Sequence, residues 1–248
     1  MKRGLFLLAL IAKLCIASVT VDTGTEADAG SFSGVTSTSY NIACSACSPN
    51  LYLVAASGTI LGHISAITFN STSFFANQAA YLNNTNLNTN QSYAEIYGLP
   101  NPSSGTHALA ITYNSSAYGD NGAVFLLGAN QTFGSSVGHT GSGGSSSSQS
   151  GTLTFTVSST ASGNAVVDAV GTYGTANISY SPGGTLVFSK NQSPQGYGGS
   201  GQYIASSGGT VTDSWTDPSS REWLGIAAEI KVPGAASVTK MQSFVLGD

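Results

Sequence analysis

The chain has 248 residues, of which 41% are apolar and 7% are charged, and its formal net charge is −4. This apolar content is enough for a sizeable core and excludes disorder throughout the chain. The seven Lys and Arg residues do not suit a nucleic-acid binder, because a phosphate backbone requires clustered cations and Lys2, Arg3 and Lys13 all lie in the N-terminal segment. The low charge also excludes a helical bundle with a charged surface.

The N-terminal segment has the pattern of a secretory signal peptide over residues 1–17. Lys2 and Arg3 precede an apolar run from Leu5 to Ala12, and small residues surround Ala17. A retained membrane anchor and a pilin-type leader cut after Gly4 are the alternatives, and Lys13 argues against the second. We therefore expect a secreted protein, extracellular or on the cell surface, with no membrane contact after cleavage.

Cleavage of this leader leaves two cysteines, Cys44 and Cys47. In an oxidising compartment we expect them to form a local disulfide. A thioredoxin-like redox motif is disfavoured because no amphipathic helix follows, and a zinc site lacks a second pair of ligands.

Seven acceptor sequons for N-glycosylation follow the leader, where random placement of the same residues gives about four. They begin at Asn70, Asn83, Asn90, Asn114, Asn130, Asn177 and Asn191. The excess predicts a glycan-covered surface.

Short stretches of alternating apolar and polar residues recur along the chain, and no stretch shows capped helical periodicity. Leu153 to Val157 and Leu224 to Val232 are the clearest cases. Further predicted strands are Val19 to Val21, Leu51 to Ala56, Ile64 to Phe69, Ser73 to Leu82, Tyr93 to Tyr97, His107 to Tyr113, Ala123 to Leu127, Ala165 to Val170, Ile178 to Tyr180, Leu186 to Ser189, Gln202 to Ala205 and Gly209 to Trp215.

These strands predict an all-β fold, a single antiparallel β-sandwich of the jelly-roll type. We expect an extended N-terminal arm over 18–40 and the sandwich domain over 41–248. The segment 134–151 is almost wholly Gly and Ser, which predicts a long flexible loop. A division into two domains at this segment is the alternative.

Several of these segments resemble a jelly-roll-like sandwich module of secreted and surface proteins from prokaryotes and phages. The similarity covers roughly Gly34 to Val232, and its most specific parts are the turn and strand from Pro102 to Thr112 and the closing strand from Ser220 to Lys231. The resemblance implies a fold and a compartment, since such modules mostly have no assigned chemistry.

Candidate catalytic and metal-binding residues are sparse and lie far apart in the chain. His63, His107 and His139 are expected to be solvated or hydrogen-bonded, and the late acids Asp168, Asp213, Asp217, Glu222 and Glu229 form no motif. Asp22, Glu26 and Asp28 are close in sequence but match no calcium loop. We therefore predict no enzyme, no metal and no cofactor.

The favoured function is structural or adhesive: a subunit of a surface filament, coat or cell-surface assembly that acts through sheet edges and the N-terminal arm. Its partners are other copies or other surface proteins, and its sparse charge predicts folding that depends little on carboxylate protonation. The alternative is a carbohydrate-binding module that uses the aromatic side chains of Trp215, Trp223, Tyr197 and Tyr203. A secreted glycoside hydrolase is the third and least favoured hypothesis.

Overall fold

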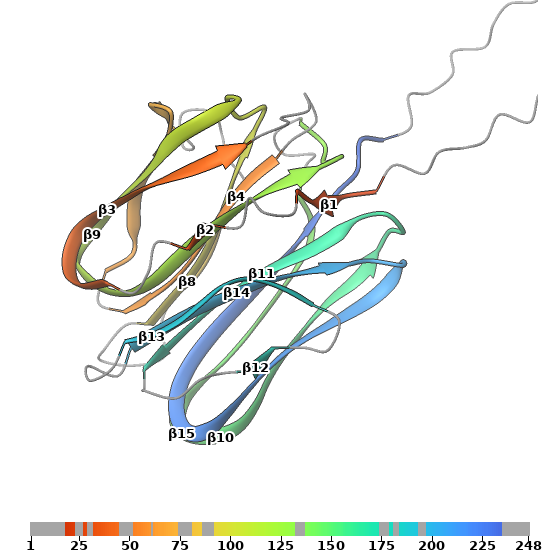
Figure 1. The fold of residues 1–248 in the computed structure, drawn as a ribbon. Helices are drawn as coiled ribbons and strands as arrows, with labels where there is room; N and C mark the ends of the chain where they lie inside the picture. The colour runs from red at the N-terminus through yellow and green to blue at the C-terminus, as the bar shows by residue number, and fades with distance from the viewer. Residues whose placement is uncertain are drawn as a thin grey trace, which may run out of the picture.

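The computed structural model describes residues 18–22, 27–28, 32–44, 52–60, 62–73, 81–85, 92–131, 137–173, 179–180, 184–192 and 197–234. Every regular element in these ranges is a β-strand, and every pairing between them is antiparallel (Figure 1). The predicted all-β fold is thus confirmed.

The strands form two sheets that divide the chain into two units, which we call unit 1 (18–131) and unit 2 (137–234). Unit 1 contains β1 (Thr20–Val21), β2 (Ala27–Asp28), β3 (Phe32–Cys44), β4 (Tyr52–Ile60), β5 (Ile64–Phe69), β6 (Thr72–Ser73), β7 (Tyr81–Thr85), β8 (Ser92–Pro100) and β9 (Gly105–Leu127). Unit 2 contains β10 (Val137–Thr160), β11 (Ala165–Tyr173), β12 (Ser179–Tyr180), β13 (Thr185–Gln192), β14 (Tyr197–Ala205) and β15 (Gly209–Ile230).

The two units share one strand topology. In unit 1 the inner order is β9-β4-β8-β7, and β3 and β5 also pair with β9. In unit 2 the inner order is β15-β11-β14-β13, and β10 and β12 also pair with β15. The matching strands β4 and β11 have nine residues each, as do β8 and β14. The chain is therefore an internal repeat, with the boundary at the start of the Gly/Ser-rich stretch.

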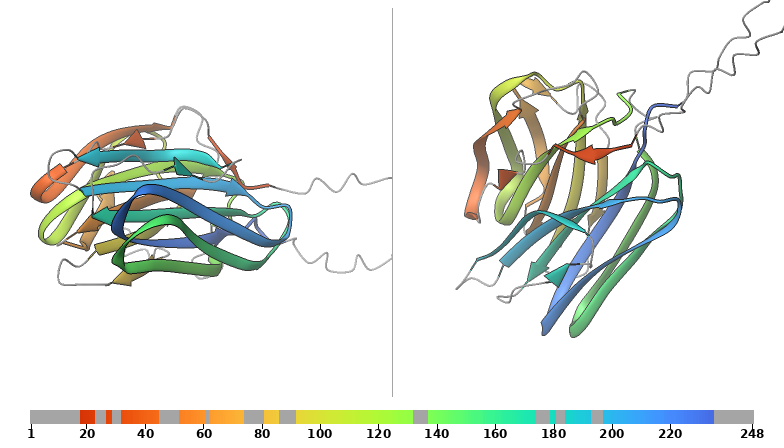
Figure 2. Two further views of the ribbon diagram at one scale, coloured as in Figure 1. Left: turned by 90° about the horizontal axis from the view of Figure 1, so that it is seen from below. Right: turned by 45° about the vertical axis from the view of Figure 1, so that its right-hand side comes forward.

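The two units pack through their inner layers in a reciprocal way (Figure 2). Strands β13 and β14 of unit 2 lie against β9 of unit 1. In the same way, their equivalents in unit 1, β7 and β8, lie against β15 of unit 2. The equivalent strands β4 and β11 contact one another. This reciprocity is that of an isologous two-fold interface within one chain.

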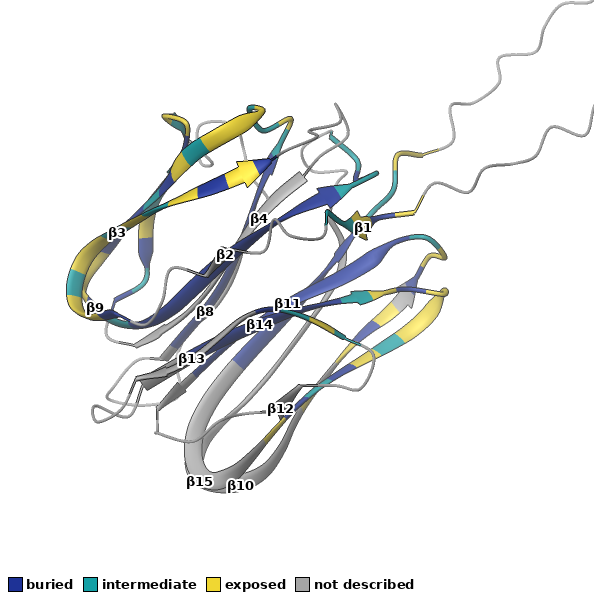
Figure 3. Ribbon diagram, in the orientation of Figure 1, coloured by how far each residue is buried: buried dark blue, intermediate teal, exposed yellow. Residues whose placement is uncertain are grey.

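Three apolar clusters follow from this arrangement, and Figure 3 shows the buried residues concentrated on the inner strands. The shared core lies between the units and draws on both; it contains Val19, Ala94, Ile96, Val124, Leu126, Ala129, Ala165, Val167, Ala169, Val187, Tyr203, Ile226, Ala228 and Ile230. The unit 1 core is centred on Phe69, Leu109 and Phe125. The unit 2 core contains Val157, Val166, Val170, Trp215 and Ala227.

Two of the predicted strand boundaries are wrong in the same way. The segments His107 to Tyr113 and Ala123 to Leu127 belong to one strand, β9, and Gly209 to Trp215 and Leu224 to Ile230 belong to β15. The first half of β9 pairs with β3 and β5, and its second half pairs with β4. Each long strand thus passes from an outer to an inner layer.

The expected Gly/Ser-rich loop is also largely wrong, because Val137 to Gly151 forms the first part of β10. It pairs with Asp217 to Ile230 of β15, from Val137 opposite Ile230 to Gly151 opposite Asp217, with several register shifts. Ladder hydrogen bonds use backbone groups alone, so a partner strand can hold a segment whose composition favours flexibility.

We expect the substitution Ile96→Ala to lower the free energy of unfolding by about 2–4 kcal/mol, because it opens a cavity in the shared core. Ile96 is 2% exposed, whereas the control position Ile204 is only partly buried, so Ile204→Ala should cost less. Urea unfolding followed by circular dichroism measures both. We expect a single transition, because the shared core couples the units; equal losses in the two variants would contradict this account.

Candidate functional site

The first described residues of the chain occupy a seat at the junction of the two units. The Val19 N–H donates to Gly163 O at 2.7 Å, and the Tyr203 hydroxyl donates to Val19 O at 2.6 Å. Val19 is 1% exposed and belongs to the shared core. We call Gly128, Gly163 and Tyr203 the arm seat. It joins the end of β9, the turn before β11 and strand β14.

Glycine at position 128 leaves room for the arm in this seat. Its φ is +74°, and a Cβ at this position would lie 2.5 Å from Ser18 O. Both the backbone conformation and the close approach therefore favour glycine.

Among its described residues, the arm upstream of β3 is held by few backbone pairs. Strand β1 pairs Thr20 with Leu127 and Val21 with Leu126, and β2 pairs two residues more with β9. The topological equivalent in unit 2 is the first half of β10, which is continuous with the rest of that strand. The predicted edge strand at Val19 to Val21 is thus present, and it is held through one buried side chain and a few hydrogen bonds.

A second polar arrangement lies inside the unit 2 core, where two carboxyl groups face each other. Asp168 and Asp213 are 1% and 0% exposed. Asp168 Oδ1 accepts from the Gln202 N–H at 2.8 Å, and its Oδ2 accepts from the Trp215 Nε1–H at 2.9 Å. Asp213 Oδ1 accepts from Gln202 Nε2 at 2.7 Å.

Burial raises the pKa of both carboxyls. The pKa of Asp168 lies well above its ordinary value because of burial and because of the charge of Asp213 and a hydrogen bond with it. Burial raises the pKa of Asp213 to about 6, against hydrogen bonds from Asp168 and other groups that lower it. Two carboxylates this close in a dry core do not both ionise, so the pair holds a proton near neutrality.

The unit 1 core contains a separate buried acid, Glu95. Its Oε2 accepts from the Ile64 N–H at 2.7 Å, and its Oε1 accepts from the Tyr97 hydroxyl at 3.2 Å. Burial raises its pKa to about 7. The expectation that folding depends little on carboxylate protonation is therefore wrong: the few acids include several that the fold removes from water.

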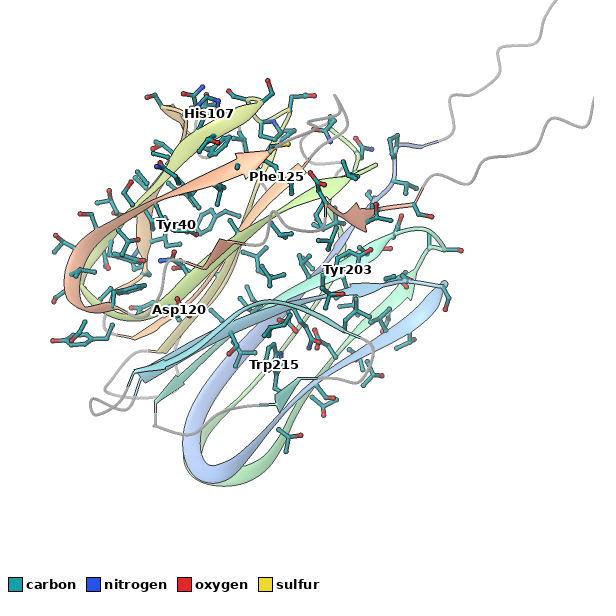
Figure 4. All side chains as sticks on the ribbon, in the orientation of Figure 1. Tyr40, His107, Asp120, Phe125, Tyr203 and Trp215 are labelled. Atoms are coloured by element: carbon teal, nitrogen blue, oxygen red, sulfur yellow. The ribbon has the colours of Figure 1, made fainter. Side chains whose placement is uncertain are left out.

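The aromatic side chains proposed as a sugar platform do not form one among the described residues. Trp215 is fully buried, and Tyr203 is 7% exposed with its hydroxyl on the arm; Figure 4 shows both on the inner sides of their strands. Trp223 and Tyr197 belong to β15 and β14, and their side chains lie outside the described residues. The two visible aromatic groups thus have structural contacts instead of an open ring face.

The histidines do not join the acidic pair. His63 Nδ1 lies 3.0 Å from Ile64 O, and His107 Nε2 lies 2.6 Å from Ser104 O while its ring packs edge-on against Phe69. The side chain of His139 lies outside the described residues. Of the late acids that the sequence left unplaced, Glu229 accepts from Asn164 Nδ2 at 2.6 Å, and the side chains of Asp217 and Glu222 are not described.

Of the three acids that lie close together near the start of the chain, only Asp22 has a described side chain. Asp22 lies beside β9, where its N–H donates to Phe125 O at 3.0 Å, Glu26 is outside the described residues, and Asp28 is in β2. No group of three or more metal-ligating side chains occurs within the described ranges.

Three of the seven sequon asparagines have described side chains. Asn70 and Asn114 are exposed and Asn130 is half-buried. Asn70 has a φ of +48° in the turn between β5 and β6. Asn83 and Asn191 lie in β7 and β13 with undescribed side chains, and Asn90 and Asn177 are outside the described residues. Glycan occupancy stays a prediction.

The disulfide also stays a prediction, because Cys47 is outside the described residues. Cys44 is buried at the end of β3, in the unit 1 core.

No protein-family model, curated protein or solved structure matches this chain. Within the described residues, no helix of a length and hydropathy suited to crossing a membrane is present.

We expect the fold to be most stable in acid. The unfolded carboxyls titrate near pH 4, whereas those of Asp213 and Glu95 keep their protons in the folded state up to about pH 6 and 7. Stability is therefore fully present below about pH 4 and falls as the pH rises toward 7, by about 3 kcal/mol for Glu95 alone. Urea unfolding at a series of pH values measures this slope.

The variant Glu95→Gln is the control for this pH dependence. Since it cannot release a proton, its stability should fall less steeply than that of the wild type between pH 4 and 7. A wild-type stability that rises over this interval would contradict the assignment.

We expect Gly128→Ala to dislodge the arm, because the new methyl group would meet Ser18 O. Gly209→Ala is the matched control, since its φ is also positive, +87°, and a Cβ there meets nothing within 4 Å. Limited proteolysis with mass spectrometry should show new cleavage near Val19 only in Gly128→Ala. Equal protection of the arm in both variants would show that the seat tolerates the side chain.

Proposed function

We propose that the chain is a non-enzymatic structural or adhesive protein of an extracellular surface, a subunit of a filament, coat or cell-surface assembly. The observation that carries this proposal is the arm seat. A strand at the N-terminal end fits a site at the junction of two packed units, and the same site on another copy offers it the same contacts.

The geometry of the seat suits exchange between copies. The strand enters with two apolar side chains, the buried Val19 and the partly buried Val21, and the backbone of Val19 is bound by Gly163 and Tyr203. Removal of a signal peptide over residues 1–17 would leave Ser18 as the first residue, so no upstream segment would hold the strand in its own subunit. Exchange then keeps the number of contacts unchanged while it links two copies.

The other features fit this role. A chain with few ionic groups has little repulsion between packed copies. The buried carboxyls have no described access to solvent, so they support the interior of the fold and not a reaction at its surface. Secretion and glycans belong to the same proposal.

We expect the purified mature protein to form ordered polymers that negative-stain electron microscopy detects at high concentration. Val19→Asp should reduce the polymer fraction at least tenfold, because a charge would enter the apolar seat. Thr20→Asp is the matched control, since Thr20 is the exposed neighbour on the same strand. Circular dichroism checks that both variants keep their strands. A wild type that remains monomeric, with residues 18–40 open to protease under all conditions, would overturn the proposal.

A further inference from the structure

The strands that have only one partner strand fall into two groups. Eight of the described strands pair with a single neighbour: β1, β2, β3, β6, β7, β10, β12 and β13. Within the described residues, the second side of such a strand belongs to no ladder, and an edge of this kind is a template for another strand.

Four of these strands carry a residue of an acceptor sequon. Strand β6 contains Thr72 of the Asn70 sequon, β7 contains Asn83, β12 contains Ser179 of the Asn177 sequon, and β13 contains Asn191. Strand β13 also contains Lys190. A glycan or a lysine on an edge strand obstructs the approach of a second strand.

The other four strands are the first strands of the two units: β1 to β3 in unit 1 and β10 in unit 2. None of them contains a sequon residue, and β3 and β10 have no charged residue and no proline over 13 and 24 residues. Protection by charge, proline or glycan is therefore missing from the two longest edges, which occupy equivalent places in the repeat.

Both edges have a regular part of similar length. Strand β3 pairs with β9 from Ser37 to Cys44 without a register shift, and β10 pairs with β15 in the same way from Gly151 to Val157. At about 3.3 Å per residue, each part offers at least about 23 Å of straight edge. The exposed side chains along them include Ser37, Ser39, Thr154 and Thr156, which are small and uncharged.

We propose that copies of this chain join edge to edge, with β3 of one copy forming backbone hydrogen bonds with β10 of the next. This inference rests on the proposed function and adds a second contact between copies, so that polymer growth requires both the exchanged arm and this joint. Because each chain has one edge of each kind, one repeated contact gives an open-ended row of copies. If β3 paired with β3 and β10 with β10 instead, an open-ended row of copies would need two different contacts.

The positions of the sequons also restrict which strand edges are accessible to a second copy. Glycans at Asn83 on β7 and Asn191 on β13, and at Asn70 and Asn177 two residues before β6 and β12, would leave the free sides of the first strands as the accessible edges, so edge-to-edge contact would be confined to β3 and β10.

Lysine substitutions at exposed edge positions test the joint. Ser37→Lys blocks β3 and Thr156→Lys blocks β10. The controls place the same lysine on interior strands: Thr112→Lys, between Ser37 and Ala66, and Thr216→Lys, between Thr152 and Ser179. All four positions are exposed, so equal thermal unfolding should accompany unequal assembly.

Sedimentation and negative staining give the readout. We expect each edge variant to lose polymer at least tenfold and to remain monomeric alone, the controls to polymerise like the wild type, and an equimolar mixture of the two edge variants to stop at dimers. A singly blocked variant that dimerises alone would overturn the pairing of unlike edges. Edge variants that polymerise normally would overturn the joint and leave the proposed function standing, whereas a wild type that never polymerises would overturn the function itself.

Discussion

The last part of β9, Gly119 to Leu126, and the last part of β15, Gly225 to Ile230, are buried on both faces, and the rest of the structure depends on that constraint. In β9, Val124 and Leu126 face the shared core while Ala123 and Phe125 face the unit 1 core. A strand buried on both faces reads as a continuous apolar run instead of an alternating one. Because each long strand continues into an outer layer, the shared core and the outer cores are built from the same backbone. The arm seat lies at the end of β9, so its position also follows from this double burial.

Buried carboxyls are placed unevenly among the three cores. Asp168, Asp213 and Glu95 bind partners within the outer cores, whereas the members of the shared core are apolar side chains and Tyr203. Loss of protons therefore introduces charge into the outer cores and leaves the junction between the units unchanged. We therefore expect the fold to tolerate acid, since low pH keeps these three carboxyls neutral. The sparse surface charge fits the same setting, because few exposed carboxylates remain to lose their ion pairs at low pH.

Much of the strand content followed from period-two alternation: Ile64 to Phe69 coincides with β5, and Ala165 to Val170 lies within β11. The failures have a common cause, which is that strand pairing over long distances overrides local composition. Gly and Ser in 137–151 predicted a loop because they have little intrinsic preference for strands, yet β15 holds them in a ladder. The pairing of the two buried acids could not be predicted from the sequence either, since Asp168 and Asp213 are neighbours only after β11 and β15 pack together. One missed signal was present: both long strands begin with Gly-Thr and have Ser-Ser ten residues after that glycine, at Ser115-Ser116 and Ser219-Ser220.

The repeat also explains why edge control matters in this molecule. Duplication of a unit duplicates its first strand, and the fold gives that strand one partner in each copy, so two long edges arise together. Charged side chains usually protect such edges from pairing with another chain. In this chain only 7% of the residues are charged, so few are present to protect them. Glycans at the sequons of the shorter edges would protect by volume, which neither salt nor pH removes, whereas ion-based protection weakens as charges are screened or carboxylates are protonated. On this reasoning, the low charge and the placement of the sequons are two parts of one solution, and the edges without a sequon are those that the proposed contact between copies would use.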